Sequence, residues 1–118
     1  MIILTETTDK IQAVLAGNVT ANQLQCYASY RDITPTLYTP GRNALLTNQT
    51  TDVDLVGSPG TSTQRVVDYL SIYNADTVAS TVTVKLDANG TETILFKGQL
   101  GIGEKLEYTN EGGWKVLT

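Results

Sequence analysis

The sequence predicts an all-β protein: an antiparallel β-sandwich of jelly-roll type with about eight or nine short strands. Apolar and polar residues alternate over several short stretches that turn residues separate, and no stretch has a convincing helical repeat. Threonine, a β-branched residue that suits a pleated surface, makes up 19 of the 118 residues. A chain of this length supports one hydrophobic core, so we expect a single domain over residues 1–118.

The first predicted strand lies within Asp9–Gly17, where two interpretations compete. Asp9 could cap a helix with one apolar face that closes at Gly17. A helix of two turns is marginal without packing, and the neighbouring elements are all strands, so we favour a strand.

A half-exposed strand is predicted over Gln23–Tyr30, where apolar and polar residues alternate one by one. Its even-numbered residues would face the core, and among them is Cys26, the only cysteine. A lone cysteine can form no disulfide within the chain, and we interpret it as a small core residue. Tyr27 lies on the opposite face with glutamine and serine neighbours, which makes it the best candidate for a surface contact.

Residues 32–62 are predicted to be a long connection, because Pro35, Pro40-Gly41 and Ser58-Pro59-Gly60 interrupt them. One short strand is expected inside it, from Thr51 to Val56. Loops of this length are usually functional or mobile, so we expect a contact arm that reaches a neighbouring subunit or a larger shell. The residues assigned to this partner contact are Pro35, Thr36, Leu37, Tyr38, Thr39, Pro40, Gly41 and Arg42, together with Tyr27.

The second half of the chain predicts a central strand and two hairpins. Arg65–Asn74 is apolar on both faces, which is typical of a strand inside a sheet. Ser80–Ala88 and Thr91–Leu100 form the clearest hairpin, since Asn-Gly lies at its tip, and Ile94 and Phe96 share one face of its second strand. The last hairpin is expected within Gly101–Thr118, with turns at both of its glycine pairs.

Catalytic residue types are scarce. Histidine is absent, which removes the commonest general base and the commonest metal ligand. The acids Glu104, Glu107 and Glu111 are better explained by a solvated face than by a catalytic pair, and Asp52-Val53-Asp54 lacks the pattern of a calcium loop. We therefore expect no enzyme, no cofactor and no catalytic or metal-binding residue.

Charge and hydropathy limit the kinds of partner that the protein is expected to bind. The net charge of −4 and the pI near 4.5 oppose binding to a phosphate backbone, and the basic residues are spread singly along the sequence. The apolar start is too short for a signal peptide, and no apolar run is long enough for a membrane span. The expected protein is made in a host cytoplasm and binds neither nucleic acid nor membrane.

Six aromatic residues could serve as a surface for stacking sugars or binding a partner, because aromatic side chains with a polar tip favour interfaces. The alternative, that most of them fill the sandwich, is preferred. The residues are Tyr27, Tyr30, Tyr38, Tyr69, Tyr73 and Trp114.

Three stretches carry a resemblance: Thr8–Gln12, Gly57–Pro59 followed by Ser62–Arg65, and the closing Gly103–Tyr108 with Gly113–Leu117. In these the chain resembles small virion structural proteins of tailed bacteriophages. The resemblance implies a capsid decoration (cement) protein, on the capsid surface of the virion, that stabilises the capsid by binding the major capsid protein or another virion protein. It also implies a homo-oligomer, with a trimer favoured. The alternatives are a head-fibre or tail-fibre base, or a carbohydrate-binding module at a tail tip that stacks sugars on Tyr27, Tyr69 or Trp114.

Overall fold

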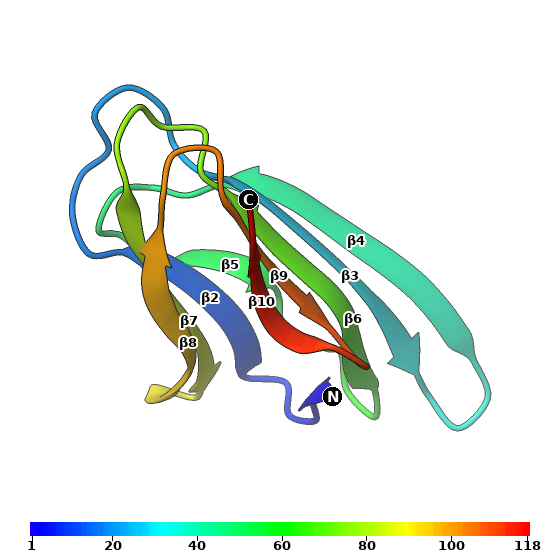
Figure 1. The fold of residues 1–118 in the computed structure, drawn as a ribbon. Helices are drawn as coiled ribbons and strands as arrows, with labels where there is room; N and C mark the ends of the chain where they lie inside the picture. The colour runs from blue at the N-terminus through cyan, green and yellow to red at the C-terminus, as the bar shows by residue number, and fades with distance from the viewer.

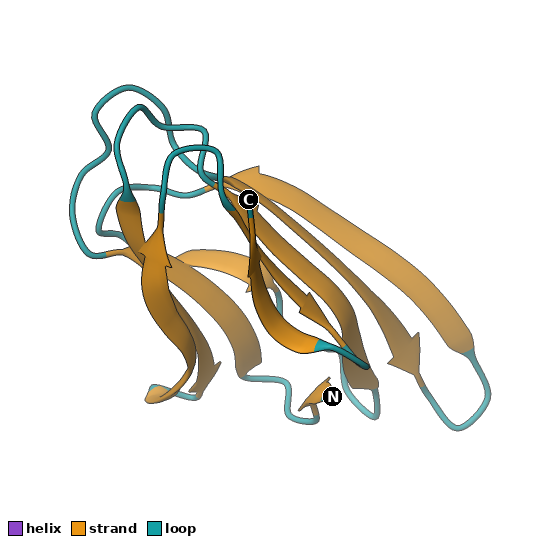
Figure 2. Ribbon diagram, in the orientation of Figure 1, coloured by secondary structure: helices purple, strands orange, loops and turns teal.

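The protein is a β-sandwich of two antiparallel sheets without a helix, as a computed structural model of all 118 residues shows (Figures 1 and 2). Sheet A has the strand order β10-β9-β6-β3-β4, with the short β1 also paired to β6, and sheet B has the order β5-β2-β7-β8. The predicted fold class is therefore confirmed. The strands are β1 (Ile2–Leu4), β2 (Asp9–Leu15), β3 (Gln25–Ile33), β4 (Tyr38–Leu46), β5 (Val53–Val56), β6 (Gln64–Tyr73), β7 (Ser80–Ala88), β8 (Thr91–Leu100), β9 (Lys105–Thr109) and β10 (Gly113–Leu117).

Strand β2 resolves the choice between helix and strand at the start of the chain. It pairs with β5 on one side and β7 on the other, and its residues Ile11, Ala13 and Leu15 are almost fully buried. Burial at every second residue is the period of a strand with one face on the core. The packing between two neighbours supplies the stability that an isolated two-turn helix would lack.

The hairpin of β7 and β8 has the predicted bounds, but one face of β8 was assigned wrongly. Asn89 and Gly90 take positive φ angles of 54° and 92° at its tip, as a tight turn requires. A β-bulge pairs Val84 with Phe96 but Lys85 with Ile94. The extra residue reverses the alternation, so Phe96 packs against the core while Ile94 is 60% exposed.

The expectation of a long connection over residues 32–62 is also wrong in part. Residues 38–46 form β4, which pairs with β3 over its whole length from Tyr38 opposite Ile33 to Leu46 opposite Gln25. Proline has no N–H and cannot donate a hydrogen bond to a neighbouring strand. Pro40 can nevertheless lie in β4, because β4 is an edge strand that is paired on one side only. The proline and glycine that suggest a loop are thus compatible with a strand, and the remaining short strand of this region is β5.

The core lies between the sheets, and three aromatic rings close one side of it. Seventeen buried residues form a single apolar cluster. At the edge where β8 and β10 meet, the Trp114 ring stacks on Phe96 with 5.5 Å between ring centroids and lies 5.0 Å from Tyr108. These contacts join the last strand of sheet A to the last strand of sheet B. The C-terminal hairpin of β9 and β10 therefore belongs to the sandwich, as predicted.

Two buried polar side chains tie the loops together at one end of the sandwich. The carboxylate of Asp76 accepts hydrogen bonds of 2.8–3.1 Å from the backbone N–H groups of Thr20, Ala21, Asn22 and Thr77. These bonds, most of all the one from Thr20, lower the pKa of Asp76 to about 2. The Asn74 amide donates to Val78, Leu100 and Gly101. Three loops that are distant in sequence share this junction.

At the opposite end, sheet A extends beyond sheet B. Figure 1 shows the turn between β3 and β4 projecting away from the strands of sheet B. No further strand pairs with the outer edge of β4. The structure has no helix of the length and apolar character that a membrane crossing would need.

Candidate interaction surface

The outer face of sheet A, the face that points away from sheet B, carries the residues that best fit a contact surface. Strand register places its side chains in rows across five strands, since directly paired residues lie on the same face. One row runs from Ala44 through Tyr27, Ser71 and Glu107 to Lys115. The next row runs from Leu46 through Gln25, Tyr73 and Lys105 to Leu117. We call this surface the outer face.

Large apolar side chains lie exposed on β3, β4 and β6 of the outer face, toward the end of the sheet where β4 and β6 finish. Tyr27 is 36% exposed, Tyr73 39% and Leu46 55%. They border a shallow groove of about 500 Å³ on β3, β4 and β6. The prediction that Tyr27 points to solvent is confirmed, and the sheet adds Tyr73 and Leu46, which the sequence alone does not bring near it.

Hydrogen bonds hold Tyr69 in place, and Tyr27 packs against it. Tyr69 packs its ring edge against Tyr27 at 6.1 Å between centroids, and its hydroxyl donates to a Glu107 carboxylate oxygen at 2.8 Å. The Lys105 ammonium donates to the same Tyr69 oxygen at 3.4 Å. This hydrogen bond, together with the charge of Glu107 at 3.6 Å, raises the pKa of Lys105. Side chains held this way lose little entropy when a partner covers them.

The predicted contact segment Pro35–Arg42 forms the turn between β3 and β4 and the first half of β4. Along β4 the even-numbered residues Tyr38, Pro40 and Arg42 lie on the outer face with Tyr27, whereas Thr39 and Gly41 face the other way. Pro35, Thr36 and Leu37 lie in the turn, which the Thr34 hydroxyl closes by accepting from the Leu37 N–H at 2.9 Å. Leu37 is 67% and Tyr38 62% exposed. The structure thus joins part of this segment to Tyr27 and separates the rest.

The root of this hairpin is rigid. The Tyr30 ring covers Gly41 on the neighbouring strand, and the Arg65 guanidinium lies over the same ring, 4.2 Å from its centroid. Arg65 also donates two hydrogen bonds to Asp32, at 2.8 and 3.0 Å. These bonds raise the pKa of Arg65 above its ordinary value. The stack of Gly41, Tyr30 and Arg65 holds β4 where no second sheet supports it.

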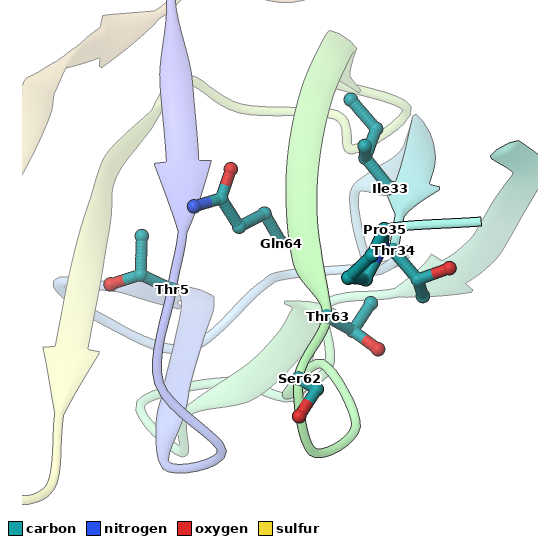
Figure 3. A pocket seen from close by; sticks show the side chains of 7 residues that line it. All are labelled: Thr5, Ile33, Thr34, Pro35, Ser62, Thr63 and Gln64. Carbon is teal, nitrogen blue, oxygen red and sulfur yellow. The ribbon is translucent and has the colours of Figure 1, made fainter. Parts of the chain in front are cut away.

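A separate polar hollow of about 490 Å³ lies at the projecting end (Figure 3). Four hydroxyl groups and one amide surround it, while Ile33 and Pro35 supply apolar surface. Ser62, in its wall, takes a positive φ of 56°, which is uncommon for a residue with a side chain. No charged residue lines this hollow. Its polar residues are Thr5, Thr34, Ser62, Thr63 and Gln64.

Several other predicted candidates have structural roles. The Trp114 ring is occupied by contacts with Phe96 and Tyr108, so it is unsuited to stacking a sugar. Cys26 is buried, and burial raises the pKa of its thiol to about 12.

The acids singled out in the sequence do not converge. Glu104 accepts a hydrogen bond from the Gly101 N–H, Glu107 lies on the outer face, and Glu111 lies in the turn between β9 and β10. Asp52 pairs with Lys85 at 3.0 Å on sheet B. No three carboxylate or thiolate side chains come together as metal ligands.

Comparisons of the chain with protein-family models, with curated proteins and with solved structures gave no significant match, so the interpretation of this surface depends on its geometry and chemistry.

Proposed function

We propose that this chain is a non-enzymatic virion structural protein of a tailed bacteriophage, which binds the particle surface as a decoration protein and stabilises the capsid. The contact is made by the outer face together with the projecting β3–β4 hairpin. The resemblance of three sequence stretches to small phage structural proteins supports the biological setting. A homo-oligomer, with a trimer favoured, would repeat this contact by symmetry.

One observation carries the proposal: a hairpin with exposed apolar side chains extends from a rigid sheet. Leu37 and Tyr38 are among the most exposed apolar residues of the molecule and lie at the tip of the hairpin, beyond the support of sheet B. The contacts of Tyr30 with Gly41 and Arg65 hold the base of the hairpin in place. Rigid, exposed aromatic and aliphatic side chains are the groups that dominate protein interfaces.

The test is binding of the purified protein to phage particles that were assembled without it. The L37S/Y38S variant should bind these particles about tenfold more weakly, because two apolar anchors are lost. The I94S/I102S variant is the matched control, since Ile94 and Ile102 are 60% and 67% exposed and lie away from the hairpin. Equal binding by wild type and L37S/Y38S would refute the assignment of the hairpin.

The polar hollow favours a second candidate, a carbohydrate-binding module at a tail tip. Hydroxyl and amide groups beside a small apolar surface suit a neutral sugar, and Figure 3 labels the side chains that line the hollow. A glycan array probed with the isolated protein tests this candidate. Binding that is lost in T63V but kept in L37S/Y38S would support it, and binding to no glycan would reject it.

A further inference from the structure

The outer face is basic although the protein is acidic. It carries Arg31, Arg42, Lys105 and Lys115 but only two acids, Asp68 and Glu107. The whole chain has eight basic and twelve acidic residues, so four basic and ten acidic residues are left for the rest of the molecule, where Asp9, Asp76 and Lys85 are buried. The sheet therefore gathers, on one face, cations that are scattered along the sequence.

Two of these four cations are available to a partner. Arg31 is paired with Asp68 at 3.0 Å, and Lys105 is held by Tyr69 and Glu107. Arg42 and Lys115 form no ion pair within the chain, and both are exposed. They lie on opposite edge strands, β4 and β10, which are four strand spacings or about 19 Å apart. Tyr27 lies on β3 between these two strands, in the same row as Lys115, and Tyr73 lies on β6 in the next row toward the end of the sheet.

The outer face is large enough for a specific contact. Five strands with about nine residues in the longer ones give a flat area of roughly 600 Å², close to the ~800 Å² that each partner of a standard interface contributes. Tyrosine is enriched in protein interfaces, whose rims are polar, and here the two free cations lie on the edge strands β4 and β10. A phosphate backbone would instead favour a continuous row of free cations, and this face offers two that are far apart.

We propose that the outer face docks on an acidic protein surface, with Arg42 and Lys115 each facing a carboxylate of the partner and with Tyr27 and Tyr73 packed against the partner's surface. The partner is a different protein, because two copies joined through this face would bring four uncompensated cations together. The proposal rests on the proposed function and specifies the chemistry of the shell surface that the protein covers.

The test uses immobilised poly-L-glutamate as a defined carboxylate surface and the full-length protein in solution at about 50 mM salt, where charges are weakly screened. Wild type should bind, and the R42Q/K115Q variant should bind about fivefold more weakly, because it lacks both free cations. The K10Q/K97Q variant is the matched control. It has the same net charge as R42Q/K115Q, and its two changes lie on the face of sheet B that points away from sheet A. It should bind like wild type.

In the binding assay, three results would overturn the proposal: absence of binding by wild type, equal weakening in the two double variants, and equally tight binding to a poly-thymidine oligonucleotide, which would indicate a general response to polyanions. Sedimentation of wild type and R42Q/K115Q gives a further check. If wild type self-associates and R42Q/K115Q does not, the outer face binds a second copy of the chain and the proposal is wrong. Particle binding that depends on Leu37 and Tyr38, without binding to poly-L-glutamate, would refute this inference and leave the proposed function intact.

Discussion

The contact between Tyr30 and Gly41 leads to the prediction that Gly41→Ala destabilises the wild-type protein but stabilises a variant that lacks the Tyr30 ring. A Cβ added at Gly41 would lie 2.7–2.9 Å from three atoms of the Tyr30 side chain, closer than real contacts allow. Tyr30 would have to turn out of its position under Arg65, which lies 4.2 Å from the ring centroid. Covering an edge glycine with an aromatic ring from the paired strand is a known way to stabilise a sheet.

The magnitude follows from two opposing effects of Gly41→Ala. Losing the cation–π contact costs about 0.5–1 kcal/mol, and an off-rotamer Tyr30 costs about 0.5–1.5 kcal/mol. Replacing a glycine by alanine reduces the entropy of the unfolded chain and stabilises by about 0.4–1 kcal/mol. The net result is destabilisation of about 1 kcal/mol, or about 4 °C in Tm for a domain of this size.

In a Tyr30→Ala background the steric conflict is absent, so Gly41→Ala should stabilise the protein by about 0.4–1 kcal/mol. Urea unfolding followed by fluorescence of Trp114, the only tryptophan, measures all four members of the cycle. The coupling free energy between the two positions should be about 1–2 kcal/mol. The same effect of Gly41→Ala in both backgrounds would show that Tyr30 does not lie on Gly41. The β3–β4 hairpin would then lack the contact that is argued to hold it in place.

Three further predictions concern the loop junction and the core. Folding favours the charged form of Asp76, whose pKa is lowered to about 2, so Asp76 should stabilise the protein above pH 4 and this stability should be lost as the pH falls from about 3.8 toward 2. Thermal melts of wild type should show this loss. The Asp76→Asn variant should have a lower Tm at pH 7 and a smaller decline in Tm over the same pH range. Ile72→Ala should destabilise by about 2–5 kcal/mol in urea unfolding, since this side chain is 1% exposed at the centre of sheet A and leaves a cavity; a loss under 1 kcal/mol would contradict the packing. Cys26, with a thiol pKa raised to about 12 by burial, should react with a thiol reagent at pH 8 only as fast as the protein unfolds, and rapid labelling of the native protein would contradict its burial.

Local patterns in the sequence determined the fold class and most strands. The tip Asn89-Gly90 is sufficient to place the hairpin of β7 and β8, because few residue pairs adopt positive φ at low cost. Strict alternation over Gln23–Tyr30 was enough to assign the exposed face of Tyr27. Both features depend only on residues that are neighbours in the chain, so they can be read without knowledge of the fold.

Pairing between distant segments decided the rest. Whether Pro40 belongs to a loop or a strand depends on its having a paired neighbour on one side only, and the orientation of Ile94 depends on a bulge opposite Lys85. The same holds for the candidate surface: Arg42 and Lys115 are separated by most of the chain, and only the register of five strands brings them to one face with the tyrosines. The sequence by itself determined most of the segments that are strands, because local alternation marks them, but it did not reveal β4. The tertiary structure alone decided which side chains share a surface, because register and sheet order join residues that have no local relation.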